Sequence, residues 1–205
     1  MKTGPRFKIA KRLGVSVFEK AQSQKFAISA ERSAKRKGGG RRGASEYGKQ
    51  MLEKQKVRVT YGLPERQFRN YVRKALAIHS ATLMPHEHLH ALLELRLDNV
   101  VYRLGLATTR RGARQMVAHG HIVVNGKRVR VPSYQVRTTD RIAVRGASKT
   151  HGVLANFALR AAERSLPRWL SWDVGAMEGA VTQVPSTESA EPAGDLHAVL
   201  SFYTR

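Results

Sequence analysis

The sequence predicts an α+β fold: a helical N-terminal domain with a basic extension, and an inserted small domain of two helices and a short twisted sheet. Apolar residues recur with the 3.6-residue period of a helix in residues 47–76 and again in residues 93–117. An Asn125-Gly126 pair between two short strand-like segments is typical of a β-hairpin. We expect a basic extension at 1–44, a helical domain at 45–94, the small domain at 95–159 and a C-terminal segment at 160–205.

The basic extension includes residues 33–42, which are too rich in glycine and charge to fold alone and are expected to order on a ligand. In the helical domain, Tyr47, Met51 and Leu52 begin one amphipathic pattern, which breaks at Tyr61 and Gly62. Pro64 suits the first turn of a second helix. Its expected inward residues are Phe68, Tyr71, Val72, Ala75 and Leu76.

The small domain is expected to begin with two helices. Gly105 ends the first, whose apolar face is formed by Leu93, Leu97, Val100, Val101 and Leu104. Thr108 or Thr109 can cap the second, and Gly120 supplies its C-terminal stop. The inward residues of this second helix are Ala113, Met116 and Val117.

Short strands follow the second helix. Residues 121–124 and 127–131 are expected to pair across a type I′ turn at Asn125 and Gly126, until Pro132 breaks the second strand. Residues 134–136 and 141–144 are expected to add further strands.

The charge of the chain predicts a polyanionic partner. It holds 37 Lys and Arg against 15 Asp and Glu, a formal net charge of +22, as expected where nucleic acid supplies the counter-charge. Residues 1–60 carry 17 basic and 4 acidic side chains, and residues 91–150 carry 12 and 3. Residues 151–205 carry 4 and 6, so the C-terminal quarter is not expected to bind nucleic acid.

Basic side chains lie on the faces that the apolar patterns leave outside. Arginine forks grip phosphate oxygens with two hydrogen bonds, which suits Arg110, Arg111 and Arg114 to phosphate contact. The arginines of the 65–76 helix either form an ordinary solvated face or contact phosphate. Lys54, Lys56 and Arg58 lie near the C-terminal end of the preceding helix. Cations there interact favourably with the helix dipole whether or not a ligand is bound. Tyr47 and Tyr134 either stack on bases or pack against a core.

Catalysis and metal binding find little support in the sequence. His86, His88 and His90 alternate as on a strand, but the apolar residues after them favour a helix, on which we expect solvent-exposed structural histidines. There is no cysteine for a disulfide or a thiolate zinc site. Residues 37–43 lack the Gly-Lys-Ser/Thr of a phosphate-binding loop. No apolar run is long enough to span a bilayer.

Four motifs of the small domain resemble the RNA-binding domain of the bacterial small-subunit ribosomal protein four family. They are LRLDNVVYRLG at 95–105, TRRGARQ at 109–115, VAHGHIVVNG at 117–126 and PSY at 132–134. Related copies of this domain occur in pseudouridine synthases, tyrosyl-tRNA synthetases and ribosome-rescue factors. Sequence outside the domain also resembles the ribosomal family, in the same order, with EYGKQMLEKQKV at 46–57, ERQFRNY at 65–71, PRWL at 167–170 and MEG at 177–179.

This resemblance implies a non-enzymatic protein that binds a multi-helix junction in the five-prime domain of small-subunit ribosomal RNA and nucleates subunit assembly. It implies no cofactor or metal. The candidate residues for ribosomal RNA binding are Lys8, Lys11, Arg12, Arg41, Arg42, Tyr47, Lys54, Lys56, Arg58, Arg66, Arg69, Arg73, Arg110, Arg111, Arg114, Gln115, His119 and Lys127.

The resemblance also implies neighbours in the ribosome. These are small-subunit proteins three and five and the channel through which messenger RNA enters, with an influence on decoding accuracy. Arg41 and Arg42 fall near the family's basic channel segment, although their spacing to Tyr47 differs. The implied location is cytoplasmic; the basic first 18 residues also mimic an organellar transit peptide, but Gly4 and Pro5 resemble the family's mature N-terminus.

Two further expectations concern the C-terminal segment and the rival functions. The chain from about residue 167 should return to pack on the helical domain through a group of apolar residues: Trp169, Leu170, Trp172, Val199, Leu200, Phe202 and Tyr203. The rival functions are an RNA-modifying enzyme, which would need a further catalytic domain, and a ribosome-rescue factor, which would not need the 47–71 helical segment.

Overall fold

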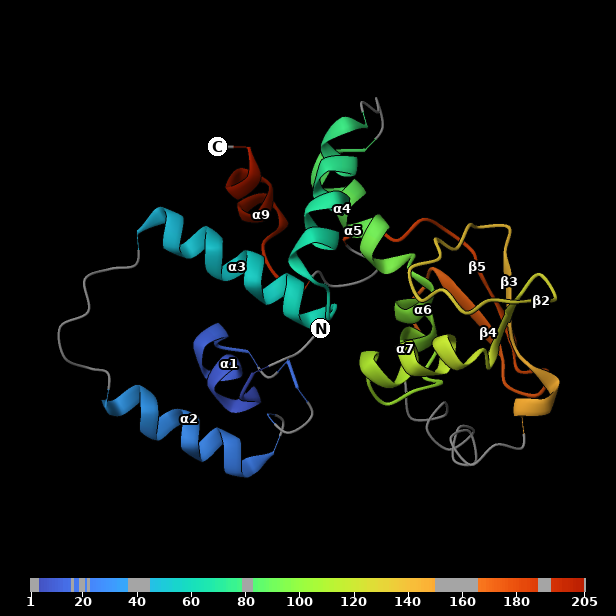
Figure 1. Ribbon diagram of the computed structural model, residues 1–205, viewed down its shortest axis with the longest axis horizontal. Coiled ribbons are helices and arrows are strands. Elements are labelled where there is room, and N and C mark those ends of the chain that lie inside the picture. The colour runs from blue at the N-terminus through green and yellow to red at the C-terminus, as the bar shows by residue number, and fades with distance from the viewer. Residues whose placement is uncertain are drawn as a thin grey trace. The chain divides into compact units, whose positions relative to one another are not determined.

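The computed structural model describes residues 4–15, 17–18, 21, 23–36, 45–78, 83–149, 166–187 and 193–204 (Figure 1). It confirms the predicted α+β class, with helices and a five-stranded antiparallel sheet. The chain forms two compact units: residues 1–81 with 192–205, and residues 82–191. Each unit is described by itself.

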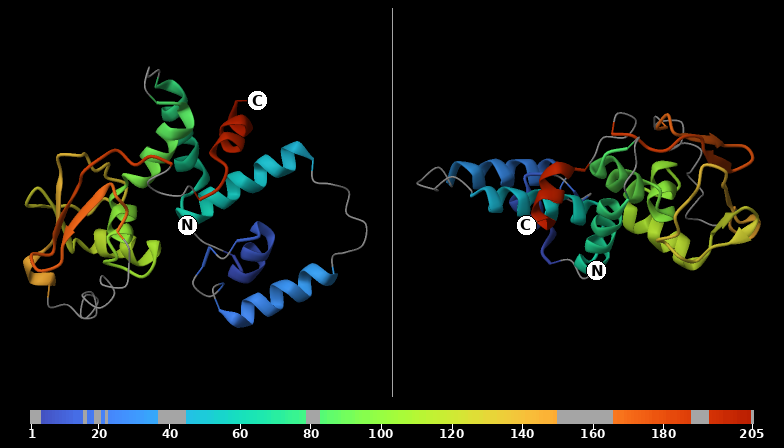
Figure 2. Two further views of the ribbon diagram at one scale, coloured as in Figure 1. Left: turned by 180° about the vertical axis from the view of Figure 1, so that it is seen from behind. Right: turned by 90° about the horizontal axis from the view of Figure 1, so that it is seen from above.

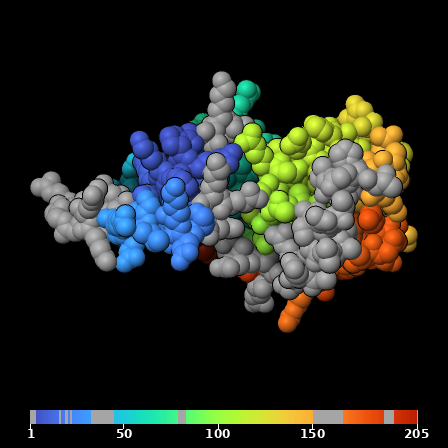
Figure 3. All heavy atoms as spheres, turned by 90° about the horizontal axis from the view of Figure 1, so that it is seen from below, coloured from blue at the N-terminus to red at the C-terminus, as the bar shows by residue number. Residues whose placement is uncertain are grey.

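The first unit begins with two basic helices, α1 (Arg6–Leu13) and α2 (Gln24–Arg36). Gly14 ends α1 with a left-handed φ of 70° and donates its N–H to the Ala10 carbonyl. The Phe7 and Phe26 rings stack with centroids 5.5 Å apart, and Lys11 Nζ donates to Ser29 Oγ at 2.7 Å. In the space-filling view, the dark-blue atoms of α1 and the lighter blue atoms of α2 adjoin (Figure 3).

Three further helices form the larger core of this unit: α3 (Glu46–Thr60), α4 (Glu65–Ala77) and α9 (Leu196–Tyr203). The Ser45 hydroxyl caps α3 by accepting the Gly48 N–H at 3.2 Å. The C-terminal helix α9 packs along α3, although about 140 residues separate them in the sequence. The fully buried apolar side chains here are Val57, Leu63, Phe68, Val72, Ala75 and Val199.

A buried cation and a carboxylate join α9 to this core. Lys54 Nζ lies 2.9 Å from Glu65 Oε1 and 4.3 Å from the centre of the Phe202 ring. Tyr203 donates its hydroxyl to Glu65 Oε1 at 2.6 Å. Burial raises the pKa of Glu65, but the hydrogen bonds from Tyr203 and Lys54 outweigh it and leave this pKa below its ordinary value. Burial, together with the hydrogen bond to the carboxylate, raises the pKa of Tyr203.

Replacing Glu65 by glutamine is expected to lower the free energy of unfolding at pH 7 by about 1–2 kcal/mol, because buried Lys54 loses its counter-charge. A depressed carboxyl pKa stabilises the fold above the ordinary pKa of 4.5 and loses that effect as the pH falls through the folded value. The difference between wild type and Glu65→Gln should therefore narrow below pH 4.5 in urea unfolding. A difference that is the same at all pH values would contradict this arrangement.

In its described part, the second unit combines three α-helices with the sheet. The helices are α5 (Pro85–Glu94), α6 (Leu97–Arg103) and α7 (Arg110–His119). The strands are β1 (Ile122–Val124), β2 (Lys127–Arg128), β3 (Arg141–Val144), β4 (Leu170–Asp173) and β5 (Glu178–Val181), in the order β2-β1-β3-β5-β4. The tight turn between β1 and β2 has positive φ at Asn125 and Gly126, as a type I′ turn requires.

One hydrophobic core joins α6 and α7 to the buried face of this sheet. Its largest fully buried side chains are Trp169, Leu97, Leu104, Leu106, Ile122 and Ile142. Alternate residues of β1 and β3 point into this core, which is why a period-two pattern in the sequence predicts them.

The prediction that the C-terminal segment packs on the helical domain from about residue 167 is wrong for the first part of the segment. Trp169 and Leu170 lie in the core of the second unit, with Trp172 packed against it, rather than on the helical domain. The reason is strand pairing: β5 pairs with both β3 and β4, so residues 170–181 complete the sheet (Figure 2). Among the described residues, the chain joins the helical unit from Gly194 onward: the Asp195 N–H donates to Glu53 Oε2 at 2.9 Å, Phe202 meets Tyr47, and Tyr203 meets Phe68.

Three expected elements also differ. The strand expected over residues 127–131 is shorter, because β2 pairs with β1 only at Lys127 and Arg128. The helix expected over residues 93–104 is divided into α5 and α6, because Arg96 adopts an extended backbone and buries its guanidinium against Asp98. Residues 134–136 form no strand; they make one isolated bridge, Arg96 with Gln135, and the Val136 N–H donates to the Leu95 carbonyl.

Candidate nucleic-acid interface

The outer face of α7 is a polar stripe. Thr109 caps the helix by accepting the Gly112 N–H at 2.9 Å, and Gly120 ends it with a φ of 73°. Arg111, Gln115 and His119 are exposed and lie four residues apart, so they follow one line along the helix surface. Ala113, Met116 and Val117 are buried on the opposite face, as the sequence predicts.

Two other arginines of α7 are half-buried and held by the neighbouring helix. Arg110 donates from Nε to Asn99 Oδ1 at 2.8 Å, and its guanidinium lies 4.5 Å from the centre of the Tyr102 ring. Arg114 donates from Nε to Asp98 Oδ2 at 2.8 Å. The sequence brings Arg110, Arg111 and Arg114 together on the first turns of one helix, and the structure fixes the direction of two of them.

The hairpin adds cations beside the end of α7. Lys127 at the turn is exposed. Arg128 donates from Nε to the Gly120 carbonyl at 3.0 Å and from a terminal nitrogen to the His119 carbonyl at 2.7 Å, which satisfies the helix C-terminus. Desolvation and the neighbouring Arg130 and Arg145 lower the pKa of Arg128, as expected for cations gathered close together.

Arg128, Arg130 and Arg145 were not among the candidates from sequence reasoning. For Arg128 and Arg130, the signal that would have found them is their alternation with Val129, which packs against the core. For Arg145, it is the alternation with the buried Ile142 and Val144 of β3.

Among the basic residues predicted to bind RNA in the helical unit, those with exposed side chains lie on α1 and α4. Those of α1 are Lys8 and Arg12, whereas Lys11 is half-buried against Ser29. Those of α4 are Arg66, Arg69 and Arg73. The Tyr47 side chain is half exposed and its ring lies 5.4 Å from that of Phe202. Arg41 and Arg42 lie outside the described residues.

Three candidates at the end of α3 have partners within the unit. Lys54 is only 7% exposed and is paired with Glu65, so its prediction as a ribosomal RNA contact is corrected to a core role. Lys56 Nζ lies 3.3 Å from Glu53, and Arg58 donates two hydrogen bonds to Gln55 Oε1, at 3.1 and 2.6 Å. The carboxylate and aromatic partners of Lys54 come from α4 and α9, which explains why its own helix does not predict its burial.

Replacing Lys54 by methionine is expected to lower the free energy of unfolding by about 1–2 kcal/mol without changing the slope of log affinity for RNA against log salt. The methylene stem is kept while the ion pair is removed. The matched control is Arg69→Ala on the exposed face of α4, for which the slope should fall by about 0.7–0.9 if that side chain meets a phosphate. A reduced slope for Lys54→Met would restore Lys54 as an RNA contact.

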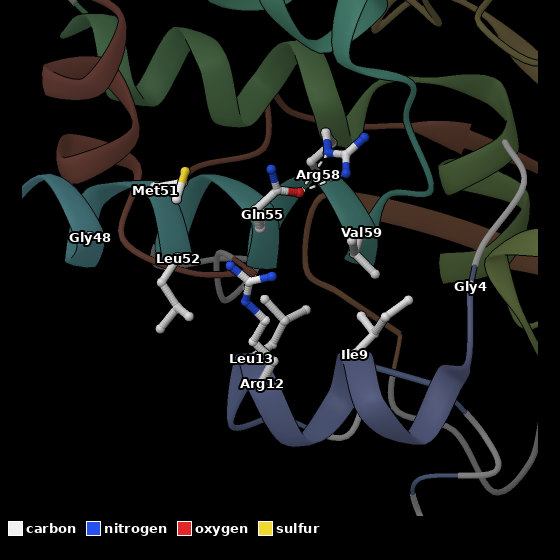
Figure 4. Close-up of a pocket in the computed structure, with 10 residues that line it drawn as sticks. All are labelled: Gly4, Ile9, Arg12, Leu13, Gly48, Met51, Leu52, Gln55, Arg58 and Val59. Carbon is white, nitrogen blue, oxygen red and sulfur yellow. Dashed lines mark hydrogen bonds between the residues drawn. The ribbon is translucent and has the colours of Figure 1, made fainter. Parts of the chain in front are cut away.

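A hollow of about 330 Å³ lies between α1 and α3 (Figure 4). In the close-up, Ile9 and Leu13 of α1 point towards Leu52 and Val59 of α3, and Arg12 reaches across towards α3. The remaining lining residues are Gly4, Gly48, Met51, Gln55 and Arg58. The hollow is mainly an apolar seam where two helices meet, and none of the described residues that line it is a carboxylate, histidine or serine.

Known proteins match nearly the whole chain. The sequence family described as "Ribosomal protein S4/S9 N-terminal domain" matches residues 1–94, and the family described as "S4 domain" matches residues 95–142. Small ribosomal subunit protein uS4 of Acidithiobacillus ferrooxidans is 42% identical over 99% of this chain and 98% of its own length. The uS4 proteins of Roseiflexus castenholzii and Limosilactobacillus reuteri are each 43% identical, over 98% and 99% of this chain respectively and 98% of their own lengths. The chain belongs to the ribosomal protein S4 family.

The matched S4 domain contains α6, α7 and the hairpin, so the polar stripe and the held arginines lie within it. The match ends inside β3, yet β4 and β5 complete the sheet from residues beyond it. The predicted family is therefore confirmed, and the structure adds a C-terminal hairpin to the S4 domain of this chain.

The histidines of this S4 family chain do not form a metal site within the part that the structure describes, where no three His, Cys, Asp or Glu side chains gather suitably. His90 is fully buried on α5, which corrects the expectation of an exposed side chain. His119 and His121 have ring centroids 6.0 Å apart, and His121 Nδ1 lies 3.0 Å from Ser148 Oγ. Among the described residues, no helix has the length and apolar character needed to cross a membrane.

Tyr134 of the S4 domain has a structural role. Its hydroxyl donates to Asp140 Oδ2 at 3.3 Å, and Asp140 also accepts from Asn125 Nδ2 and the Arg137 N–H. Burial and the Asp140 carboxylate raise the pKa of Tyr134. Of the two interpretations of Tyr134, the structure favours packing and hydrogen bonding over base stacking.

Proposed function

We propose that this S4 family chain is a structural constituent of the small ribosomal subunit, in the cytoplasm, and binds ribosomal RNA. The observation that carries this proposal is the polar stripe and held arginines of α7, within an S4 domain that is part of a full-length match to uS4 proteins. These relatives are structural proteins rather than enzymes, in agreement with the prediction of a non-enzymatic function.

Affinity comes from cations that neutralise phosphates and release counterions, which carries little sequence information. Specificity comes from shape, because folded RNA presents its phosphates in a fixed arrangement. In the S4 domain, the guanidinium groups of Arg110 and Arg114 are held by Asn99 and Asp98, while Arg111 is exposed. In the helical unit, the exposed arginines of α4 supply a second basic surface.

The target of these surfaces is a multi-helix junction in the five-prime domain of small-subunit ribosomal RNA, and its binding nucleates assembly of the subunit. Two basic surfaces, one in each unit, support a target with several helices, because each surface engages the backbone of a different one. The candidate contacts are the exposed side chains Lys8, Arg12, Arg66, Arg69, Arg73, Arg111, Gln115, His119 and Lys127, with half-buried Arg110 and Arg114.

In the assembled subunit, we propose that the chain lies beside small-subunit proteins three and five and borders the channel through which messenger RNA enters. Its influence on decoding accuracy would act through the contact with protein five. The support for this placement is the resemblance of the chain to the family, in which Arg41 and Arg42 fall near the basic channel segment, although their spacing to Tyr47 differs.

Sedimentation of tagged full-length chain expressed in bacteria tests the proposed function. We expect stoichiometric recovery in small subunits after a high-salt wash, because a primary ribosomal RNA contact is built into the particle. A ribosome-rescue factor would instead be recovered with large subunits, and an RNA-modifying enzyme would remain in the ribosome-free fraction. Either result would overturn the proposal.

A further inference from the structure

Two buried carboxylates lie under the first turns of α7. Glu94, at the end of α5, is fully buried, and Asp98 on α6 is 3% exposed. Arg103 donates two hydrogen bonds to Glu94, both at 2.8 Å. Arg96 donates two to Asp98, at 3.0 and 2.8 Å. Each buried carboxylate therefore already has a guanidinium group bound to both of its oxygens.

Each carboxylate also reaches an arginine of α7. Asp98 Oδ2 accepts directly from Arg114 Nε. Glu94 acts through Asn99, whose Nδ2 donates to Glu94 Oε2 at 2.9 Å and whose Oδ1 accepts from Arg110 Nε at 2.8 Å. Because Nδ2 is committed to the carboxylate, the amide of Asn99 is oriented with its oxygen towards Arg110.

The balance of charge shows what these contacts achieve. Counted over these contacts between described residues, each group contains two guanidinium groups and one carboxylate, a difference of one positive charge. The surplus lies at the first turns of α7, where the helix dipole is also positive and no acidic residue is present. An arrangement built for stability alone would place acidic side chains there. Asp98 directly, and Glu94 through Asn99, thus orient the two α7 arginines.

We propose that Asn99 and Asp98 are positioning residues that hold Arg110 and Arg114 ready for two phosphates at a fixed spacing in folded RNA. The proposal rests on the proposed ribosomal RNA-binding function. A side chain that is held in advance loses less freedom when it binds. Folded RNA presents phosphates at fixed positions, so it binds more tightly when the arginine side chains are already in place. A flexible strand can adapt to any arrangement of these side chains. The network therefore favours structured over unstructured RNA.

Arg111 provides the matched comparison within the same turn. It is exposed, and it makes no hydrogen bond or ion pair with any residue that the structure describes. Lysine in place of Arg110 keeps the charge but cannot reproduce the Nε bond to Asn99. The same substitution at Arg111 changes the phosphate ligand in the same way without breaking such a bond.

The test measures the affinity of the full chain for two probes, a five-prime-domain transcript of bacterial small-subunit ribosomal RNA and poly(U). Asn99→Ala and Arg110→Lys should each weaken binding to the transcript about two- to tenfold, with poly(U) affinity and the salt slope on the transcript unchanged. Arg111→Lys should change the ratio of the two affinities by less than Arg110→Lys does. In an Arg110→Ala background, Asn99→Ala should have no further effect.

Several results would overturn the proposal. One is an equal loss of affinity for the transcript and for poly(U). Another is a ratio of these two affinities that Arg110→Lys leaves unchanged. A third is a further loss of affinity for the transcript when Asn99→Ala is added to Arg110→Ala. If Asn99→Ala unfolds the domain, the comparison of Arg110→Lys with Arg111→Lys decides alone, because Arg110 is half-buried and Arg111 exposed, and neither belongs to the fully buried core. The outcomes separate this proposal from the proposed function: if Arg110→Ala changes neither the affinity for the transcript nor its salt slope, the α7 site itself is wrong.

Discussion

Replacing Arg110, Arg111 and Arg114 together by alanine is expected to weaken binding of the full chain to the five-prime-domain transcript by roughly a hundredfold. Each guanidinium-phosphate contact at a solvated surface contributes about 1 kcal/mol net, and three of them together give about two factors of ten. The slope of log affinity against log salt should also fall by about 0.7–0.9 for each phosphate that these side chains no longer neutralise. Filter binding or fluorescence titration from low to moderate salt measures both quantities.

Thermal unfolding is the control for this triple variant. Arg96 and Arg103 remain bound to the two buried carboxylates after the substitutions, so no buried charge is left without a counter-charge. The melting temperature should therefore stay close to that of the wild type. Unchanged affinity and slope in a folded triple variant would show that these side chains do not face phosphate.

Trp169→Ala is expected to lower the free energy of unfolding of the second unit by about 3–5 kcal/mol. Trp169 is fully buried in the core shared by α6, α7 and the sheet, so its removal leaves a large cavity. Urea unfolding followed by the fluorescence of the remaining tryptophan, Trp172, measures this effect, because both tryptophans of the chain belong to this unit.

Trp172→Ala is the matched control. Trp172 is half-buried on the edge strand β4. Its substitution by alanine should therefore lower the free energy of unfolding clearly less than that of Trp169. Equal, small effects of the two substitutions would contradict the placement of residues 169–173 in the sheet of the second unit. They would favour loose packing of this segment elsewhere.

Elements defined by local chemistry could be predicted from the sequence. The helix α7 has its Thr109 cap, its buried stripe and its Gly120 end within one stretch of twelve residues, and the hairpin turn needs only Asn125 and Gly126. The exposure of Arg111 and Gln115 follows from the same helical period. These features depend on neighbours in the chain, which a sequence displays directly.

Elements that depend on distant partners could not be predicted. Residues 170–181 become strands because β3 offers an edge to β5, and nothing near Trp169 indicates that edge. The helical pattern runs continuously through Arg96, and the break there comes from burial of its guanidinium against Asp98. Lys54 resembles an exposed helix cation until Glu65, Phe202 and Tyr203 surround it.

For Arg110 and Arg114 of the candidate site, some properties could likewise be predicted from the sequence and others could not. Their residue types and spacing are evident in the sequence, and arginine is recognisable as a phosphate ligand. Their orientation depends on Asn99, Asp98 and Tyr102 of the preceding helix, which contact them only once α6 and α7 are packed together. The sequence therefore predicts which side chains bind, and the structure adds the residues that orient them.

Hydroxyl-radical footprinting of the ribosomal RNA five-prime domain, with wild-type protein and with the Arg110/Arg111/Arg114 triple alanine variant, tests the central claim most directly. We expect the wild-type chain to protect backbone positions on several helices that meet at one junction. The triple variant, at a concentration that restores binding, should lose the protections beneath the S4 domain while keeping those beneath the helical unit. The absence of a clustered footprint with wild-type protein, or identical footprints for both proteins, would contradict the claim.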